Sequence, residues 1–267
     1  MSVNRSAAAR GAGESLIPRA RRHAALGEPA RLAVVDHLLL GDASPGELGD
    51  LVDLPTNLLA HHLKVLDHAG LIRRVRSEGD RRRSYVQLRL DDPEVASVLT
   101  GSPSRGPGTA AGPDGAAAAV SRVVFVCTHN SARSQLAAAA WARASAIPAA
   151  SAGTHPAARV HPGAIAAGRR HGLRLAGART STLADTVQDG DLLVAVCDNA
   201  HEELATTPAL SAGIARPPLS AGRGWLHWAV PDPVRVDTPS AFETAYQHVT
   251  ARVDRLAAAL DPQRSAS

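Results

Sequence analysis

The sequence is poor in cysteine and has no long apolar run, and each shortage excludes a class of protein. Only two cysteines, Cys127 and Cys197, occur among 267 residues, which is too few for the disulfide framework of a small secreted domain. We therefore expect a reducing, cytoplasmic compartment. No stretch of about 18 uninterrupted apolar residues is present, and no apolar core follows the N-terminal arginines. We expect neither a membrane span nor an exported protein.

Lysine is almost absent, and positive charge is concentrated in one short segment. The net charge is +4 and Lys64 is the only lysine, so the abundance of arginine and alanine reflects a coding bias as much as chemistry. Residues 72–90 nevertheless hold seven arginines against two acidic residues, Glu78 and Asp80, which leaves a local excess of five positive charges. A basic patch of this kind suggests a polyanion as partner.

Composition divides the chain into two predicted domains. The length and the 45% hydrophobic content are enough for one or two cores. Residues 1–15 hold almost nothing to bury and are expected to be a disordered start. Residues 101–120 are rich in Gly, Ala, Pro and Ser and are expected to be a flexible linker. The predicted domains are residues 16–100 and residues 121–262.

The first domain carries helix patterns followed by a hairpin pattern. The segment "ARLAVVDHLLLG" has apolar residues at helical spacing, and Ser44, Pro45 and Glu47 form a helix-start signature. Pro55 and Gly70 bracket the next helix. Two β-prone runs around the turn-forming "SEGD" predict a hairpin. This order of elements is that of a mainly α winged helix-turn-helix domain.

Such a domain binds DNA with its second motif helix in the major groove and its basic hairpin on phosphates. The residues predicted to contact DNA are Thr56, Asn57, His61, His62, Lys64, Arg73, Arg76, Arg81, Arg82 and Arg83. For any one of them the alternative is a place on a solvated turn or on a packed helix surface. The order of elements together with the charge favours DNA binding.

The segments "HHLKVLDHAGLI" and "LGEPARLAVVDHLL" resemble the ArsR family of arsenic- and metal-responsive repressors, over residues 16–92. The resemblance implies a homodimer that binds operator DNA and releases it when a ligand binds. Two features depart from the family. Leu58, Leu59 and Ala60 replace part of the polar face of the recognition helix, and no cysteine precedes Cys127. The thiolate site that many members carry beside this motif is therefore missing, and any sensing must come from elsewhere.

After the linker, strand and helix patterns alternate. The apolar runs "RVVFVC" and "DLLVAVC" are each followed by a polar turn and a helix, which predicts an α/β domain with a parallel sheet. Ligands bind at the carboxyl ends of the strands in such sheets, and both Cys127 and Cys197 fall there. A last helix is expected after Ser240 as its N-cap.

The stretch "CTHNSARS" joins the first of these strands to its helix, with Cys127 and Arg133 six positions apart. A loop in this place turns successive N–H groups toward one point, where the helix dipole adds positive potential, so an oxyanion binds. The other predicted members of this loop are Thr128, His129, Asn130, Ser131, Ala132 and Ser134. Arg133 donates two hydrogen bonds to the anion, and Cys127 below it is a thiolate nucleophile.

Asp232, in "HWAVPDP", is a candidate proton donor or acceptor for this chemistry. Simpler alternatives exist for each part. Cys127 can be a buried cysteine at a strand end, Asp232 a plain turn aspartate, and Asn130 and Ser134 braces of the loop. The combination favours the catalytic interpretation more than any single residue does.

Four segments resemble the low-molecular-weight tyrosine phosphatases and, within that fold, the arsenate reductases. They are "VCTHNSARSQLA", "SAGTHPAARVHPGAI", "LLVAVCDNAHEEL" and "HWAVPDP", and the resemblance covers about residues 121–262. His129 and Ala132 stand where the phosphatase branch typically has Gly and Cys. Together with Trp141 they favour the reductase branch.

The resemblance implies a role for each matching residue. Cys127 attacks arsenate while Arg133 holds its oxygens, and Asp232 assists proton transfer to the departing oxygen. A second thiol then releases arsenite. In the three-cysteine reductases two further cysteines stand seven residues apart; Cys197 matches the first of them, and Leu204 occupies the other position. Cys197 can also be only a small apolar residue at a strand end.

We therefore expect an arsenic-linked transcriptional regulator with a fused arsenate reductase-like domain. Its expected partners are operator DNA, arsenate, arsenite or a phosphate-like oxyanion, and a second copy of the chain. No bound cofactor and no metal are expected, and an external small thiol or a redoxin serves as reductant. Two alternatives stay open: a protein phosphatase with a DNA-binding domain, and a catalytically silent repressor that senses an oxyanion or arsenite.

Overall fold

The chain forms two compact units in the computed structural model, which describes residues 16–100, 120–207 and 224–260. The described part of the first unit is 16–39, 43–75 and 84–100; that of the second is 40–42, 76–83, 120–207 and 224–260. The expected disordered start and nearly all of the expected linker lie outside the described residues, and the predicted domain boundaries stay predictions. Within the described ranges, no helix is both long and apolar enough to cross a membrane.

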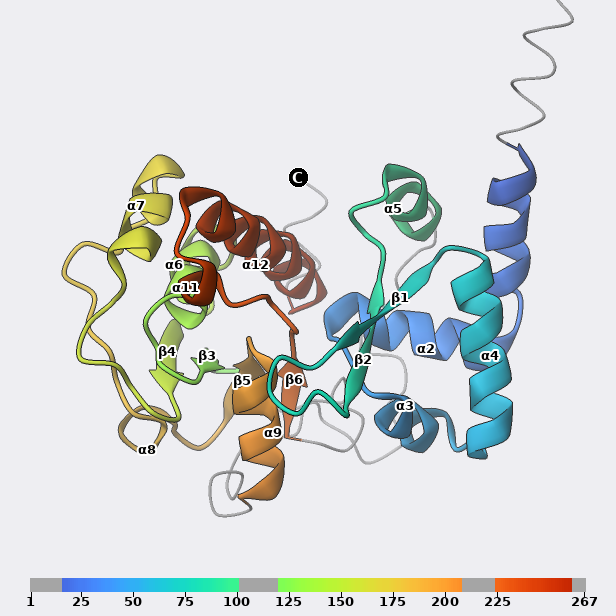
Figure 1. Cartoon of the computed structure of the whole chain (residues 1–267), viewed down its shortest axis with the longest axis horizontal. Coiled ribbons are helices and arrows are strands. Elements are labelled where there is room, and N and C mark those ends of the chain that lie inside the picture. The colour runs from blue at the N-terminus through green and yellow to red at the C-terminus, as the bar shows by residue number, and fades with distance from the viewer. Residues whose placement is uncertain (1–15, 101–119, 208–223, 261–267) are drawn as a thin grey trace, which may run out of the picture. The chain divides into compact units, whose positions relative to one another are not determined.

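The first unit is mainly helical (Figure 1). Residues 16–26 are helical. They are followed by α2 (Pro29–Leu40), α3 (Pro45–Val52), α4 (Thr56–His68), β1 (Ile72–Arg76), β2 (Ser84–Leu88) and α5 (Pro93–Thr100). The sequence patterns did not predict α5. The core of this unit comes from the apolar faces of the helices and of β1 and β2, and its fully buried members include Val34, Leu48, Leu63, Leu66, Leu71, Ile72 and Val86.

The predicted start of α3 is confirmed in detail. Ser44 Oγ accepts a hydrogen bond from Glu47 N at 3.3 Å, and the Glu47 carboxylate accepts one from Ser44 N at 2.7 Å. This capping box satisfies two N–H groups that the helix itself leaves without partners. At the far end of α4, Gly70 has a φ of +71°, a conformation that glycine adopts without the steric cost of a side chain.

A four-stranded parallel sheet organises the second unit. Its strands are β3 (Arg122–Cys127), β4 (Ala149–Gly153), β5 (Asp191–Ala195) and β6 (Trp225–His227), in the spatial order β4-β3-β5-β6. β3 pairs in parallel with β4 on one edge and with β5 on the other. The winding of the chain therefore reverses between β3 and β5. In open α/β sheets, ligands bind outside the carboxyl ends of the strands at such a reversal.

Helices cover both faces of this sheet. They are α6 (Arg133–Ala144), α7 (Pro162–Arg170), α8 (Leu183–Thr186), α9 (Asp198–Thr206), α11 (Pro233–Val236) and α12 (Pro239–Leu260). In Figure 1, α6, α7 and α12 group on one side of the sheet and α9 lies on the other. This is the α/β domain with a parallel sheet that the alternating strand and helix patterns predict.

The apolar core of the second unit is centred on Phe125 of β3. Its ring centroid lies 5.9 Å from that of Trp141 and 5.6 Å from that of Trp228, and all three side chains are fully buried. Each indole N–H has a backbone partner, Ile147 O for Trp141 and Leu40 O for Trp228, both at 2.8 Å. Aromatic clusters of this kind bury a large apolar area, so this cluster contributes much of the packing around β3.

The predicted cap of the last helix is wrong. α12 begins at Pro239, and Ser240 already belongs to its first turn. Thr238 caps the helix instead, because Thr238 Oγ1 accepts a hydrogen bond from Ala241 N at 3.3 Å. A capping side chain lies outside the helix and reaches the N–H two or three positions ahead, which Thr238 does and Ser240 does not.

Candidate active site

The loop between β3 and α6 has its carbonyl groups directed outward. The carbonyl oxygens of Cys127, Thr128, His129 and Ser131 accept hydrogen bonds of 2.8 to 3.1 Å from the backbone N–H groups of Thr154, His155, Ala157 and His161. The segment after β4 therefore holds the loop from outside. This arrangement leaves the inner side of the loop to its N–H groups and to the N-terminus of α6, which is the geometry that binds oxyanions.

Asn130 is the structural centre of the loop. Its backbone is left-handed, with a φ of +49°, which asparagine tolerates better than most residues. Its side chain is fully buried, and Asn130 Oδ1 accepts hydrogen bonds from Ser181 N at 2.8 Å and Gln135 Nε2 at 3.1 Å. Asn130 Nδ2 donates to Ser134 Oγ at 2.9 Å. The amide thus ties the loop to two neighbouring segments at once.

Cys127 lies at the carboxyl end of β3 with its sulfur directed into the loop. Cys127 Sγ accepts a hydrogen bond from Asn130 N at 3.2 Å and lies 3.1 Å from Ser134 Oγ. Both groups can donate to a thiolate, which is the reactive form of cysteine. Asn130 and Ser134 therefore do more than brace the loop, because the Asn130 backbone N–H and the Ser134 hydroxyl both lie at the sulfur.

Arg133 opens α6 and is buried, with a side chain only 4% exposed. Its Nη1 donates to Val230 O at 3.0 Å and to the carboxylate of Glu78, and its Nη2 lies 3.4 Å from Asp232 Oδ2. Burial alone would lower the pKa of Arg133, but the acidic groups around it, led by Cys197 and Glu78, raise that pKa overall. The site therefore holds a permanent, enclosed positive charge.

Cys197 follows β5 and caps α9, and it faces the same site. Its sulfur accepts a hydrogen bond from Ala200 N at 3.4 Å and lies 3.6 Å from Thr128 Oγ1. Burial raises the pKa of the Cys197 thiol to about 11, against the opposing effect of Arg133. Cys197 is therefore a thiol at neutral pH, and it becomes a nucleophile only when it is deprotonated.

The residues predicted for the oxyanion chemistry thus come together in one place. Cys127, Arg133, Asp232 and Cys197 meet at the carboxyl ends of β3 and β5, around the loop of Thr128, His129, Asn130, Ser131, Ala132 and Ser134. Asp232 also caps the short helix α11, since Asp232 Oδ1 accepts from Val234 N at 3.0 Å. Its other oxygen, Oδ2, faces Arg133. Leu204 is buried in α9 as part of the core.

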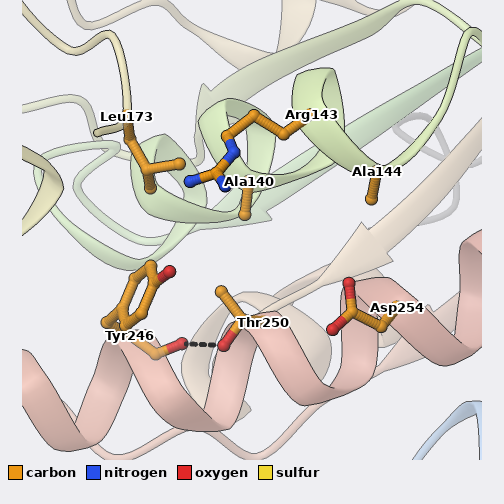
Figure 2. A pocket seen from close by; sticks show the side chains of 7 residues that line it. All are labelled: Ala140, Arg143, Ala144, Leu173, Tyr246, Thr250 and Asp254. Atoms are coloured by element: carbon orange, nitrogen blue, oxygen red, sulfur yellow. Dashed lines mark hydrogen bonds between the residues drawn. The ribbon is translucent and has the colours of Figure 1, made fainter. Parts of the chain in front are cut away.

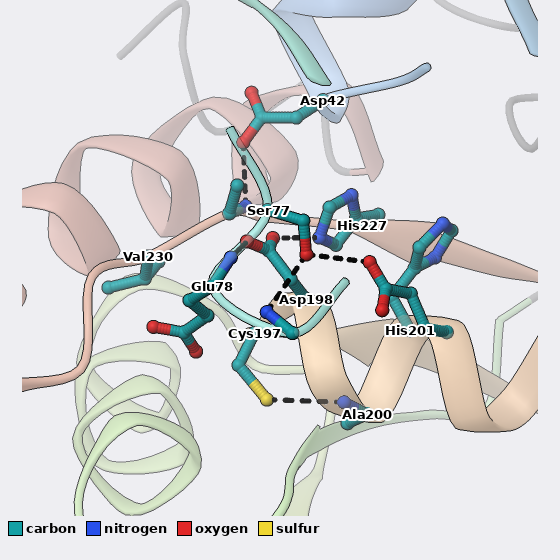
Figure 3. A network of polar contacts seen from close by, with 12 residues as sticks. Asp42, Ser77, Glu78, Cys197, Asp198, Ala200, His201, His227 and Val230 are labelled. Atoms are coloured by element: carbon teal, nitrogen blue, oxygen red, sulfur yellow. Dashed lines mark hydrogen bonds and ion pairs between the residues drawn. The ribbon is translucent and has the colours of Figure 1, made fainter. Parts of the chain in front are cut away.

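Sequence reasoning missed the acidic residues that surround this site. Glu78 pairs with Arg133, and Glu202 of α9 accepts a hydrogen bond from Asp80 N. Asp198 lies beside Glu78 (Figure 3). Burial raises the pKa of the Glu78 carboxyl, although Arg133 acts in the opposite direction. A sequence signal for α9 existed in the acidic run "CDNAHEE", directly after Cys197. Glu78 is 55 positions away from Arg133, and no local pattern links the two.

Most of the residues predicted to contact DNA are exposed. Thr56, Asn57, His61, Lys64, Arg76, Arg81, Arg82 and Arg83 are exposed, and Arg73 is partly buried. His62 is the exception, because it is buried with its Nδ1 3.4 Å from Glu28 Oε2. A buried ring directed at Glu28 is not placed to reach a base or a phosphate, so the predicted contact by His62 is not supported. Arg82 is paired with Asp80 at 2.9 Å.

A separate pocket of the second unit lies away from these residues (Figure 2). It is formed between α6 and α12 and is lined by Ala140, Arg143, Ala144, Leu173, Tyr246, Thr250 and Asp254. None of these residues belongs to the loop or to its acidic surroundings. The pocket therefore does not contribute to the oxyanion site.

The comparison with protein families identifies the domain that carries this site. The family described as low molecular weight phosphotyrosine protein phosphatase matches residues 122–266, more than half of the chain. The chain belongs to this family. The match begins at β3 and includes the loop, both cysteines and Asp232. No curated protein matches the chain.

Solved structures similar to this phosphatase-family chain include two kinds of enzyme. One is the tyrosine phosphatase Wzb from Escherichia coli K30 in complex with sulphate, with 23% identity over 52% of this chain and 96% of that one and a TM-score of 0.43. Another is an arsenate reductase in its oxidized state, with 24% identity, 52% and 98% coverage and a TM-score of 0.43. A third is arsenate reductase from Archaeoglobus fulgidus, with 26% identity, 51% and 98% coverage and a TM-score of 0.39. With TM-scores below 0.5, these similarities do not decide between the two activities.

The close contact between Gly153 and the loop after β3 can be tested by substitution. A Cβ at this position would lie 2.8 Å from Thr128 O and 3.1 Å from Asn130 N, both of them backbone atoms. We expect Gly153→Ala to displace the loop, to lower the free energy of unfolding by about 1–3 kcal/mol, and to weaken the binding of inorganic phosphate. Thermal unfolding and calorimetric titration measure the two effects. Gly46→Ala, where a Cβ has 3.9 Å of room, is the control. Unchanged phosphate affinity in Gly153→Ala would contradict the close contact between Gly153 and the loop.

Proposed function

We propose that the second unit reduces arsenate with thiols and that the first unit binds DNA, so that the chain is an arsenic-linked regulator with its own reductase. The observation that carries the proposal is the second sulfur in the oxyanion site. Hydrolysis of a phosphate ester needs one nucleophilic cysteine and then water. A two-electron reduction needs two thiols. Cys127 and Cys197 both face Arg133, and Thr128 Oγ1 lies 3.6 Å from Cys197 Sγ.

The proposed reaction has two steps. First, the Cys127 thiolate bonds to arsenic, the bond from arsenic to one oxygen breaks, and Asp232 assists proton transfer to that oxygen, which leaves as water. Next, a second thiolate attacks Cys127 Sγ, the sulfur–arsenic bond breaks, and its electron pair stays on arsenic. As(V) thereby becomes As(III), and two thiols become one disulfide. Arg133 and the loop N–H groups stabilise the negative charge on the oxygens throughout.

Two thiols can take the second step. Cys197 is within the site, but its thiol is protonated at neutral pH, and Leu204 in α9 gives the chain no third cysteine to reduce a Cys127–Cys197 disulfide. An external small thiol or a redoxin is therefore needed for repeated turnover. The family also contains phosphatases, so phosphatase activity is the rival function. Turnover of p-nitrophenyl phosphate that exceeds arsenate reduction would favour that rival.

The proposed DNA-binding function rests on the exposed polar face of α4 and on the arginines of residues 76–83. α3 and α4 are two short helices joined by a tight turn, and β1 and β2 follow them, in the order of a winged helix-turn-helix of the ArsR kind. Thr56, Asn57 and His61 are exposed on α4, where side chains would reach bases. A homodimer and an operator with two half-sites complete this proposal. A silent repressor, in which the second unit binds an oxyanion or arsenite without turnover, is its alternative.

The nucleophile can be tested directly. We expect Cys127→Ser to abolish arsenate reduction and any hydrolysis of p-nitrophenyl phosphate, because a serine hydroxyl stays protonated where a thiolate forms. Arsenite formation is measured with a small thiol and, separately, with a redoxin. Binding of inorganic phosphate should persist in the variant and shows that the loop is intact. Arsenite formation by Cys127→Ser at the parent rate would exclude Cys127 as the nucleophile.

The role of Cys197 predicts a limited reaction without added reductant. The reduced protein alone should form at most one arsenite per chain, and Cys197→Ala alone should form none. Because burial raises the pKa of Cys197 to about 11, its thiolate fraction and the single-turnover rate should still be rising at a pH of about 9.5, beyond the ordinary cysteine pKa of about 8.5. With an external thiol, both proteins should turn over repeatedly. Several turnovers without any thiol would contradict this mechanism.

The proposed contacts between the arginines of residues 81–83 and DNA phosphates can be tested through the salt dependence of DNA binding. Replacing Arg81, Arg82 and Arg83 with alanine should weaken binding to duplexes of any sequence. It should also reduce the slope of log affinity against log salt by up to about one for each lost phosphate contact. Fluorescence anisotropy with mixed-sequence duplex DNA measures both. Alanine at three other exposed arginines, Arg159, Arg169 and Arg174, is the charge-matched control. An unchanged slope in the first variant would rule out these contacts.

A further inference from the structure

A turn of the second unit, residues 77–80, contacts the oxyanion site although it is far from the loop in sequence (Figure 3). Its Glu78 accepts a hydrogen bond from Arg133 Nη1 and forms an ion pair with it. The Glu78 side chain is only 17% exposed. A carboxylate presents two oxygens to a guanidinium in much the same way as a tetrahedral oxyanion does. Glu78 therefore binds N–H groups of Arg133 that the proposed ligand would otherwise bind.

Two acidic residues of α9 hold this turn in place. Glu78 N donates to Asp198 Oδ2 at 2.8 Å, and Asp80 N donates to Glu202 Oε2 at 3.0 Å. The other oxygen of Glu202 accepts from Ser77 Oγ at 2.6 Å. Hydrogen bonds to ionised carboxylates are among the stronger ones in proteins. The contact of Glu78 with Arg133 thus belongs to a turn with several anchors and is not an isolated surface ion pair.

Besides its hydrogen bonds, the turn packs closely against α9. A Cβ on Gly79 would lie 2.3 Å from Asn199 Oδ1 and 2.7 Å from Glu202 Oε2, so a side chain here would have to displace the ends of both side chains, including the carboxylate oxygen that accepts the hydrogen bond from Asp80 N. Asp198 in turn is oriented by His227, whose Nε2 lies 2.9 Å from Asp198 Oδ1. Figure 3 shows Ser77 and Glu78 beside Asp198 and His227, at the end of α9 that carries Cys197.

We propose that the turn 77–80 is a built-in competitor of the oxyanion, with the Glu78 carboxylate as the resident anion on Arg133. The proposal rests on the proposed function, because it assumes that Arg133 binds an oxyanion. Two anions close to the same guanidinium repel each other strongly in a partly buried site. An incoming oxyanion therefore displaces Glu78, and the turn leaves α9 with it. The free site is then the minor form, and its population limits the apparent affinity for the ligand.

The expected size of the effect follows from this population. The apparent dissociation constant equals the intrinsic constant divided by the fraction of molecules with a free site. If the turn is docked in about 90% of molecules, its release tightens oxyanion binding about tenfold. Coupling between two sites in proteins commonly falls between about 5-fold and 150-fold. Tightening within this range is measurable by direct titration.

Two variants weaken the docking of the turn by different means. Glu78→Gln keeps the shape of the side chain and removes its charge. Gly79→Ala leaves every charge unchanged and places a methyl group against Asn199 and Glu202. Glu243→Gln is the matched control, because Glu243 is a partly exposed carboxylate that pairs with His171 on another part of the same unit. Inorganic phosphate is the probe, since it is not reduced and reports binding alone.

Calorimetric titration of the reduced full-length protein with phosphate is the first measurement. We expect Glu78→Gln and Gly79→Ala to bind phosphate at least about fivefold more tightly than the parent, and Glu243→Gln to bind within about twofold of it. Equal affinities in the parent and in both turn variants would overturn the competitor role of the turn and leave the proposed function standing. No phosphate binding by any of the four proteins would overturn the proposed function together with this inference.

Amide hydrogen exchange of Glu78 and Asp80 is the second measurement. Both N–H groups donate to carboxylates of α9, so they should be protected in the free protein. Saturating phosphate should remove this protection in the parent, while the amides within β3 should stay protected. Unchanged protection of Glu78 and Asp80 with phosphate bound would overturn the release of the turn, because the anion would then bind without displacing it.

Discussion

The buried guanidinium of Arg133 is the constraint on which the rest of the site depends. A charge that is 4% exposed has lost most of its hydration and needs anions or hydrogen-bond acceptors nearby. In the second unit these are Val230 O, Glu78 and Asp232. The carboxyl ends of the strands, the loop and α9 all meet at this cation. The anionic ligand that we propose for this site would replace some of these contacts.

The two cysteine sulfurs of the chain differ in environment although they lie in the same site. Cys127 receives a backbone hydrogen bond from Asn130 at the tip of a loop that faces the N-terminus of α6. Cys197 is fully enclosed, and burial raises its pKa to about 11. Such a difference suits the proposed two-thiol reaction, because donors that can stabilise a thiolate surround Cys127, whereas burial keeps Cys197 as a thiol. Family membership alone does not supply this distinction.

The segment of residues 76–83 has two kinds of side chain with opposite partners. Its four arginines, Arg76 and Arg81 to Arg83, are exposed, whereas Ser77 is buried and Glu78 is directed to Arg133. Asp80 lies between these groups, and its hydrogen bond with Arg82 lowers the pKa of the Asp80 carboxyl to about 2. A single turn therefore carries the proposed contacts with nucleic acid phosphates and the carboxylate that competes with an oxyanion.

Local chemistry in the sequence was sufficient for several helices, for β3 and β5 and for placing Cys127 and Cys197 at the ends of those strands, whereas α5, α7, β4 and β6 were not predicted. The capping box of Ser44 and Glu47, the alternation that produces the parallel sheet, and the spacing of Cys127 and Arg133 are all properties of neighbouring residues, and neighbours interact in the same way wherever the chain folds. The tertiary structure alone decided the long-range contacts. Arg133 meets Glu78 across 55 positions, His62 is buried against Glu28, and Asp198 is aligned by His227. These pairs depend on how distant segments pack, and packing is set by the shape of the whole core, which no short stretch of sequence encodes.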